Sequence, residues 1–242
     1  MARTLWPMTV HVRLFAMLRE RAGTSALELE LPEGARVADA LAALEHLAGG
    51  LTCLLAVNRE YADADQVLVA GDELALIPPV SGGDPAAEGT DGASRPSPPG
   101  DAGSAEPHVR VCAEPLSLEA LAARVRDPRA GAVVTFSGVT REVERLEYEA
   151  YVEMAEPAMR QIVAGAIERH GLCAAAAEHR TGVVPLSEPS VTVAVSAPHR
   201  GAAFEGAREI IDAIKDRAPI WKLEVEGERR RWVEGTVPGE GG

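Results

Sequence analysis

One stretch of the chain, residues 84–106, constrains the fold more than any other feature of the sequence. It contains no large apolar side chain and is dense in Pro, Gly, Ala, Ser and acidic residues. Such a segment cannot bury enough apolar surface to offset the entropy lost on ordering. We therefore predict a flexible linker at 84–106 between a domain at 1–83 and a domain at 107–235, followed by a disordered tail at 236–242. A length of 242 residues suits two domains.

Charge and hydropathy argue against two classes of function. The net charge of −13 argues against nucleic acid as a partner, because a phosphate backbone is bound by clustered positive charge. No apolar run reaches the roughly 18 residues that a membrane span needs, and charged residues soon interrupt the N-terminal segment. We therefore expect neither a membrane segment nor a secretory signal peptide.

The three cysteines, Cys53, Cys112 and Cys173, lie far apart and include no C-x-x-C pair. This spacing favours neither a disulfide framework nor a zinc site. We therefore predict that the protein holds no metal and belongs in the reducing cytoplasm.

Lysine is rare in this chain. Of the 24 basic residues only Lys215 and Lys222 are lysines, and the others are arginines. A desolvated lysine can lose its proton and act as a base or a nucleophile, whereas arginine keeps its charge. Two lysines seven positions apart in an arginine-rich chain therefore hint that a primary amine is required there. On these numbers alone, two solvated surface lysines are an equally good explanation.

Periodicity in the first domain predicts a small mixed α/β fold. Clean alternation of apolar residues predicts strands at 8–14 and 27–31, with a turn between them at 17–25. Helical spacing follows at 37–47, and short apolar strands are expected at 54–57 and 73–77. This order is typical of a ubiquitin-like β-grasp domain with a mobile C-terminal tail.

The end of this domain carries a recognisable motif. The strand order and the closing sequence GDELALIPPVSGG resemble the small sulfur-carrier subunit of molybdopterin synthase. In that family the terminal Gly-Gly enters a partner's active site, and the last glycine is adenylated and converted to a thiocarboxylate. The resemblance places this group on Gly83, preceded by Gly82. Glycines suit the task because they have no side chain to obstruct a narrow channel.

The second domain alternates strands and helices, which predicts an α+β or α/β sandwich. Strands are expected at 109–112, 131–138, 146–151, 174–180, 190–196 and 221–225, and helices at 117–125, 155–170 and 201–216. The apolar run at 131–138 predicts a buried strand.

Candidate chemical groups of this domain fall at turns and at the ends of elements. Arg141 follows a glycine turn, and His199 and Arg200 precede a helix whose positive N-terminus favours anions. Lys215 falls in the last turn of that helix, and Lys222 lies in the next strand. We expect these five residues to converge on an anionic ligand, because arginine binds phosphate in a bidentate manner and lysine as a point charge. The alternatives are a helix cap for His199 and Arg200 and a solvated loop position for Arg141.

Neighbouring aromatic and acidic residues are assigned structural roles. Trp221 and Phe136 are predicted to lie in the core, and His179 inside a strand. Residues 147–149 and Tyr151 are interpreted as the alternation of a strand and not as a catalytic acid pair.

Long segments of the second domain, among them FSGVTR, LEYEAYVEMA, SAPHRGAAFEGAREIIDAIKDRAPIWKLE and RRWVEG, resemble the large, catalytic subunit of molybdopterin synthase. The resemblance covers nearly all of residues 109–235 and implies an α+β fold class with an α/β hammerhead-like catalytic domain. It implies that the substrate is bound by Val139, Thr140, Arg141, His199, Arg200, Lys215, Lys222, Leu223 and Glu224. It also places the two essential lysines of the family on Lys215 and Lys222. One departure is local: the loop after Arg141 is shorter than is usual in the family, which puts loop contacts over the substrate in doubt.

Both halves of a two-subunit enzyme therefore resemble parts of this one chain. The resemblance implies conversion of cyclic pyranopterin monophosphate to molybdopterin, by insertion of two sulfurs as a dithiolene, with no permanently bound cofactor. It implies as partners an adenylating, sulfur-loading enzyme, an upstream sulfur donor and a downstream molybdenum-inserting enzyme. A homodimer through the catalytic domain is also implied.

The fusion raises a chemical difficulty. A thiocarboxylate needs a free carboxyl group, but Gly83 is joined to Asp84 by an amide. We expect cleavage after Gly83, since proline-rich linkers are accessible to proteases. Four alternatives stay open: Gly241-Gly242 as the acceptor tail, an uncleaved non-catalytic assembly module, a catalytic domain served by a separate carrier, and a carrier that supplies another pathway such as thiazole synthesis.

Overall fold

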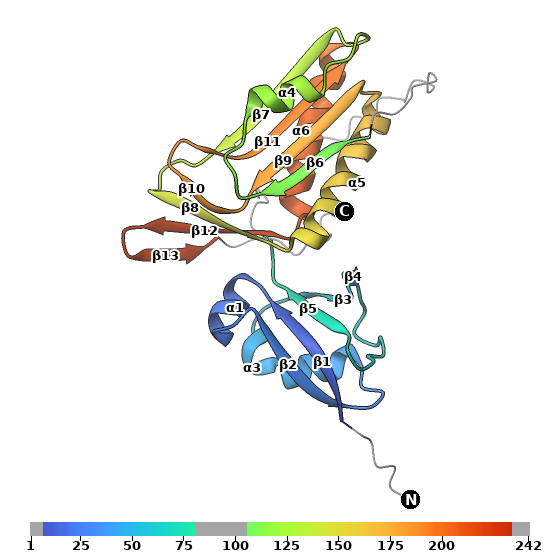
Figure 1. Cartoon of the computed structure of the whole chain (residues 1–242), viewed down its shortest axis with the longest axis vertical. Helices are drawn as coiled ribbons and strands as arrows, with labels where there is room; N and C mark the ends of the chain where they lie inside the picture. Colours follow the sequence, from blue (N-terminus) through green and yellow to red (C-terminus); the bar gives the residue numbers. More distant parts are fainter. Residues whose placement is uncertain (1–6, 81–105, 234–242) are drawn as a thin grey trace, which may run out of the picture. The chain divides into compact units, whose positions relative to one another are not determined.

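The computed structural model of the chain describes residues 7–80 and 106–233, which form two compact units (Figure 1). Each unit has its own hydrophobic core. The α+β fold class is confirmed for both. Nearly all of the predicted linker, the tail at 236–242 and the two Gly-Gly pairs lie outside the described residues.

The N-terminal unit is a five-stranded sheet in the order β2-β1-β5-β3-β4 with three short helices. The strands are β1 (Pro7–Leu14), β2 (Ala26–Pro32), β3 (Leu54–Val57), β4 (Glu60–Tyr61) and β5 (Glu73–Ile77), and the helices are α1 (Ala16–Ala22), α2 (Val37–Ala43) and α3 (Glu45–Ala48). β1 pairs antiparallel with β2 and parallel with β5. This mixed sheet is the predicted ubiquitin-like β-grasp. Its core consists of aliphatic side chains such as Val10, Val12 and Leu14, which alternate along β1.

The predicted turn at 17–25 is wrong, because α1 occupies most of it. Its sequence, AMLRERA, consists of residues with high helix propensity. The helix ends at Gly23, whose positive φ of 69° gives a left-handed C-cap, and it buries Leu18. Helix propensity alone therefore indicates this helix between the two strands.

The C-terminal unit contains two four-stranded sheets and three helices. The first sheet has the order β6-β9-β11-β7 and the second the order β10-β8-β12-β13. Their strands are β6 (His108–Cys112), β7 (Ala132–Val139), β8 (Arg145–Ala150), β9 (Ala174–Arg180), β10 (Gly182–Pro185), β11 (Pro189–Ala197), β12 (Ile220–Glu226) and β13 (Arg229–Trp232), and the helices are α4 (Leu118–Arg124), α5 (Val152–His170) and α6 (Arg200–Arg217).

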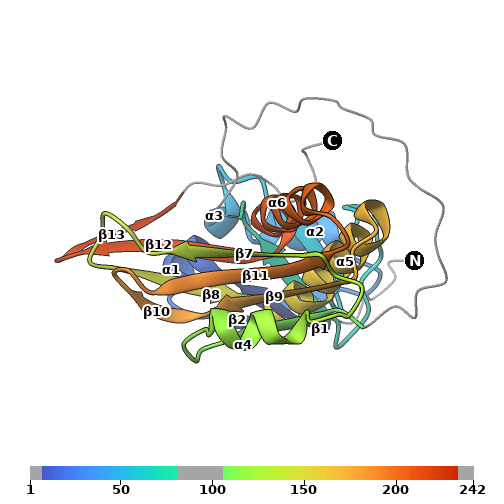
Figure 2. The ribbon, with the colours of Figure 1, turned by 90° about the horizontal axis from the view of Figure 1, so that it is seen from above.

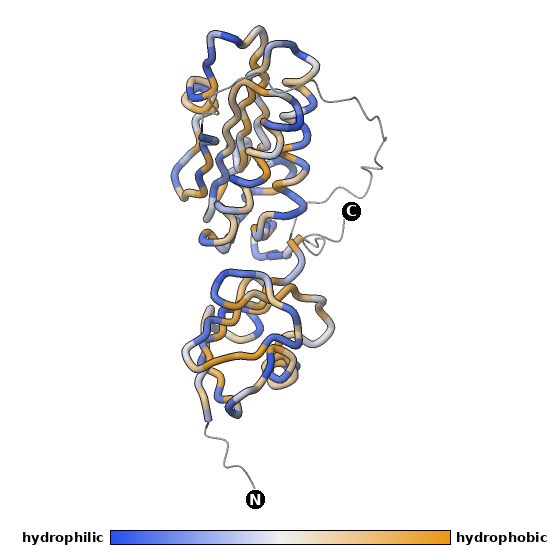
Figure 3. Tube along the Cα trace, turned by 90° about the vertical axis from the view of Figure 1, so that its right-hand side faces the viewer, coloured by the Kyte–Doolittle hydropathy of each residue, from blue (hydrophilic) through white to orange (hydrophobic). Residues whose placement is uncertain are grey.

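Helices cover both faces of the first sheet, with α5 and α6 on one face and α4 on the other (Figure 2). The alternation of β9 explains how a run of alanines serves both layers. Ala175 and Ala177 pack in the core with α5 and α6, whereas Ala174 and Ala176 pack under α4. Along the chain, apolar stretches alternate with hydrophilic ones in both units (Figure 3).

The strand predicted as buried at 131–138 is instead the edge strand β7. Val133 is 51% exposed, and only one face of the strand, with Val134 and Phe136, packs against the core of α5 and α6. A run of apolar residues does not reveal whether a second neighbour exists, and here β11 is the one strand that pairs with β7 in the described part of the chain.

Three other details differ from the predictions. The strands β10 and β13 were not predicted, because they are short and depend on pairing with β8 and β12. Tyr151 is not a strand residue but the N-cap position of α5, which begins earlier than the expected helix. The core assignments of Trp221, which is buried, and Phe136 are confirmed.

Candidate active site

A cleft of about 530 Å³ opens in the C-terminal unit, where the two sheets meet the last turns of α6. One face of β12 supplies a row of alternate residues: Ile220, Lys222, Glu224 and Glu226. Ile211, Ile214 and Lys215 of α6 form a second side. The cleft therefore combines an apolar floor with charged groups, as small-molecule sites commonly do.

Five residues of the predicted site line this cleft: Val139, Arg141, Lys215, Lys222 and Glu224. The two lysines come from different elements, α6 and β12, and the breaking sequence Ala218-Pro219 between them turns the chain back toward the cleft. Neither lysine ammonium forms an ion pair with a carboxylate among the described residues. Their charges are therefore available to a bound anion.

The pKa of Lys222 is affected by burial and by the charged groups around it. Its pKa lies below the usual lysine value, mainly because partial burial disfavours the charged ammonium. Glu224 opposes this shift, whereas Lys215 and Arg141 add to it by repulsion. Lys222 thus holds its proton less tightly than an exposed lysine does.

Thr140 and Leu223 were predicted to bind substrate but do not line the cleft. Thr140 is buried, and its Oγ1 donates to the carbonyl oxygen of Val184 at 3.3 Å while its N–H donates to that of Glu188 at 3.1 Å. Leu223 is buried on the opposite face of β12 from Lys222. Both side chains hold the framework of the site.

His199 and Arg200 lie at the far end of α6 from Lys215. Fifteen helical residues at 1.5 Å each separate Arg200 from Lys215 by about 22 Å. Both residues are exposed, and His199 is the N-cap residue without a capping hydrogen bond from its side chain. The expected convergence of all five cationic or imidazole side chains therefore does not occur within one chain.

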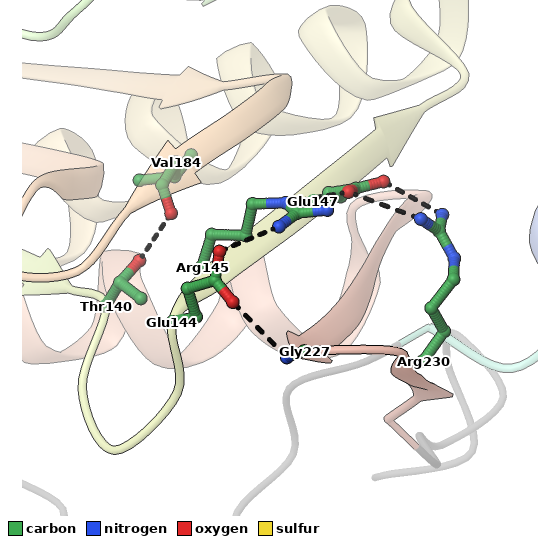
Figure 4. A network of polar contacts seen from close by, with 7 residues as sticks. All are labelled: Thr140, Glu144, Arg145, Glu147, Val184, Gly227 and Arg230. Carbon is green, nitrogen blue, oxygen red and sulfur yellow. Dashed lines mark hydrogen bonds and ion pairs between the residues drawn. The ribbon is translucent and has the colours of Figure 1, made fainter.

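The loop between β7 and β8 spans only residues 140–144 and is fixed at both ends. Thr140 fixes its start, and the Glu144 carboxylate accepts hydrogen bonds from the Gly227 N–H at 3.2 Å and from Arg145 at 3.1 Å (Figure 4). The next pair of contacts joins Glu147 to Arg145 and to Arg230 of β13. Glu147 is thus a strand residue in a surface network, as predicted. Arg141, in the middle of the loop, keeps its side chain 82% exposed.

Several polar residues that line the cleft were not predicted as site residues. Arg231 of β13 lines the cleft and donates to Glu224 at 2.7 Å. Tyr148, His179 and Ser190 line it from β8, β9 and β11. Tyr148 shares a face of the sheet with Lys222, its cross-strand partner, but nothing in the sequence indicates that this face borders a cleft.

The described residues contain no group of three His, Cys, Asp or Glu side chains that could hold a metal ion. In residues 7–80 and 106–233, every helix is too short or too polar to cross a membrane. Gly82, Gly83, Gly241 and Gly242 lie outside the described residues, so their assignments stay predictions.

A ubiquitin-like unit that precedes an α/β unit with a cationic, lysine-bearing cleft defines a two-domain protein suited to an anionic small molecule. The sequence matches the MoaE protein family over residues 111–217 and the ThiS family over residues 12–83. It is 43% identical over 124 residues to the molybdopterin synthase catalytic subunit of Thermoplasma volcanium, covering 49% of this chain and 90% of that protein. The chain belongs to the family of molybdopterin synthase catalytic subunits, which are enzymes of molybdenum cofactor biosynthesis.

Two solved structures are also similar. The X-ray structure of molybdopterin synthase from Staphylococcus aureus is 36% identical and has a TM-score of 0.49, with 50% of this chain and 93% of that chain covered. The crystal structure of SAMP1 from Haloferax volcanii is 35% identical and has a TM-score of 0.29, with 31% of this chain and 99% of that chain covered.

Proposed function

We propose that this chain is a fused molybdopterin synthase, which converts cyclic pyranopterin monophosphate to molybdopterin with sulfur carried by its own N-terminal unit. The observation that carries the proposal is the gathering of Lys215, Lys222, Arg141 and Arg231 around one cleft in a catalytic-subunit family member. Four positive groups there outnumber the three carboxylates of Glu142, Glu224 and Glu226. That balance favours an anionic substrate.

In this proposal, Arg141 and Lys215 bind the phosphate group of the substrate. Arg141 has a largely exposed guanidinium on a short, fixed loop, so it can turn toward a phosphate at little conformational cost. Lys215 adds a point charge from the last turn of α6.

Lys222 is the stronger candidate for proton transfer. Its lowered pKa brings the ammonium closer to the range in which it exchanges a proton at physiological pH. In this proposal Lys222 moves protons as sulfur reaches the substrate, and Lys215 holds the substrate. Covalent engagement of the substrate by either lysine is the alternative.

A homodimer would give His199 and Arg200 a role. Since α6 holds them about 22 Å from Lys215 of their own chain, they would serve the cleft of a second copy. The exposed Phe204, one turn along the same helix, offers an apolar contact for such a copy.

The sulfur donor in this proposal is a thiocarboxylate on Gly83, with Gly82 before it, formed by an adenylating, sulfur-loading enzyme after cleavage of the chain. A free C-terminal carboxyl is required, because an adenylate cannot form on the amide to Asp84. Intact mass measurement of the protein from its native cell tests this step. Fragments divided after Gly83, with oxygen exchanged for sulfur on the smaller one, are expected.

The catalytic proposal is tested by single-turnover assay. The full chain is mixed with cyclic pyranopterin monophosphate and a thiocarboxylated copy of residues 1–83, and formation of the dithiolene is followed. Product is expected only with the thiocarboxylated carrier, and the carboxylate form is the control. An intact, unmodified chain in the cell together with an active assay would favour a separate carrier. Absence of product with both would leave the non-catalytic assembly module.

A further inference from the structure

Three uncharged polar side chains also line the cleft, Tyr148, His179 and Ser190, and we call them the neutral wall. It joins three strands from two sheets, β8, β9 and β11. The rings of Tyr148 and His179 meet edge to face, with centroids 5.0 Å apart and planes inclined by 71°. None of the three was assigned to the site from the sequence.

Every hydrogen that this wall can donate is already used within the protein. His179 is buried, and its Nδ1–H donates to the carbonyl oxygen of Arg180 at 2.9 Å. The Ser190 hydroxyl donates to the carbonyl oxygen of Gly138 at 3.2 Å, and the Tyr148 hydroxyl donates to Ser190 Oγ at 3.1 Å. The donors therefore point along a fixed chain that ends on backbone carbonyls.

Hydrogen-bond acceptors are what the wall has left to offer. The Nε2 atom of His179 carries a lone pair in this tautomer and has no hydrogen-bond partner among the described residues. The Tyr148 oxygen keeps its own lone pairs free while it donates. The pairing of β11 with β7 shifts its register between Pro189 and Val191, and both Ser190 and Val191 line the cleft.

Burial keeps the wall uncharged at neutral pH. Desolvation lowers the pKa of His179 to about 4 and outweighs the opposing effect of its hydrogen bond to the Arg180 carbonyl. Desolvation also raises the pKa of Tyr148. A phosphate group, which has only acceptors at its oxygens when ionised, finds no donor here and is left to the lysines and arginines.

We infer that the neutral wall is an acceptor-only surface that binds the N–H edge of the pterin ring, with His179 Nε2 as the residue atom that determines this specificity. The inference rests on the proposed function and deepens it. The 2-amino and ring N–H groups of a pterin lie on His179 and Tyr148, beside Lys222, and the phosphate end is left to Lys215 and Arg141. The substrate is thereby held in one of its two possible orientations.

Two fluorescent ring compounds test the inference on the full chain without the sulfur step. Pterin carries the 2-amino donor, and lumazine carries a carbonyl acceptor at the same place. The wild-type chain is expected to bind pterin at least tenfold more tightly than lumazine, measured by fluorescence titration, with inorganic phosphate affinity measured separately. Equal affinity for the two rings would overturn the inference.

A pair of substitutions separates recognition from structure. His179→Asn keeps a donor near Nδ1 but removes the acceptor at Nε2, whereas His179→Gln extends its amide to the Nε2 position. We expect His179→Asn to lose the preference for pterin, His179→Gln to keep it within about threefold of the wild type, and phosphate affinity to stay unchanged in both. A merely structural role predicts the reverse, with Gln the more damaging change.

Thr192→Val is the matched control. Thr192 is buried in β11, the strand that carries Ser190 of the neutral wall, but it does not line the cleft. It should leave the preference for pterin unchanged. Thermal unfolding of all three variants identifies any that fail to fold, and Tyr148→Phe gives a second, milder test of the wall. A chain that forms the dithiolene but whose ring preference survives His179→Asn would refute this inference alone. A chain that neither turns over nor binds pterin would refute the proposed function as well.

Discussion

The N-terminal unit buries aliphatic side chains almost exclusively, and Asp72 is the one polar or charged residue buried among its described positions. The catalytic unit buries seven: Thr140, Glu178, His179, Arg180, Ser190, Thr192 and Ser196. A buried polar group is costly unless it is hydrogen-bonded, so such groups persist where the fold or the chemistry requires them. In the first unit the chemistry is expected at a C-terminal tail outside the core. In the second we propose it for a cleft whose lining includes core residues such as Ile211 and Ile214.

The same comparison explains why the buried polar contacts are easier to predict from the sequence in the N-terminal unit than in the catalytic unit. Asp72 serves a local turn: its carboxylate accepts from the Val69 N–H at 2.8 Å and from Asn58 Nδ2 at 2.9 Å. The polar groups around the cleft connect different strands and sheets. Their partners are distant in sequence, as with Tyr148 and Ser190.

The largest expected effect falls on the lysines of the cleft. Lys222→Arg keeps a positive charge but removes an amine that can give up its proton, so single-turnover sulfur transfer should fall by about a hundredfold or more. Lys215→Arg should mainly weaken substrate binding. Asp212→Asn on the exposed face of α6 is the control. Full turnover in both lysine variants would contradict the assignment of chemistry to this unit.

Acid should destabilise the catalytic unit through His179. Its folded pKa of about 4 lies below the ordinary histidine value, so between these values the unfolded chain binds a proton that the folded unit does not. The stability is complete above the unfolded pKa and is lost as pH falls toward the folded one. Between about pH 7 and pH 5 the wild type should lose about 2 kcal/mol more than His179→Asn does.

Denaturant unfolding at the two pH values measures this difference. Glu178 and Glu209, whose pKa values are lowered, lose their contributions at lower pH, and they do so in both proteins. An identical pH dependence in wild type and variant would show that the imidazole of His179 is not held neutral by the fold.

Removal of the buried carboxylate of the N-terminal unit should leave the other unit unaffected. Asp72→Ala removes the hydrogen-bond acceptor of the Val69 N–H and of the Asn58 amide. This loss should lower the free energy of unfolding of that unit by about 1–3 kcal/mol. Hydrogen exchange measured by mass spectrometry should become faster in β3 and β5 and should stay unchanged in β9 and β11. The exposed Asp65 supplies the control substitution Asp65→Ala. Equal loosening of both units would contradict their independence.

The smallest effect separates two adjacent arginines of β13. Arg231 lies on the cleft face with Glu224, and Arg230 lies on the other face with Glu147. Arg231→Ala should raise the KM for the substrate by about fivefold, which corresponds to about 1 kcal/mol for one exposed charge. Arg230→Ala should leave KM unchanged and cost less than about 1 kcal/mol of stability. Equal KM values in the two variants would mean that the alternation of β13 does not define the cleft.

Local periodicity predicted most of the elements. The strands at 54–57 and 73–77 have the predicted bounds, and α6, which carries Lys215 in its last turn, differs by one residue at each end from the predicted helix at 201–216. Alternation along β12 buries Leu223 and leaves Lys222 and Glu224 on the other face, a distinction that the predicted binding set of these three residues did not make. These features depend on residues close in sequence, for which side-chain spacing and propensity are sufficient.

The sequence alone determined the two-domain character at 84–106, the fold class of each unit and the family, together with the pair of lysines that turned out to share a cleft. Tertiary structure decided which face of each strand borders that cleft, so only it revealed Tyr148, His179, Ser190 and Arg231. It also decided that α6 keeps His199 and Arg200 away from Lys215. The reason is physical: alternation fixes that two faces exist, whereas the packing of distant elements decides which of them is covered and which is left open to a ligand.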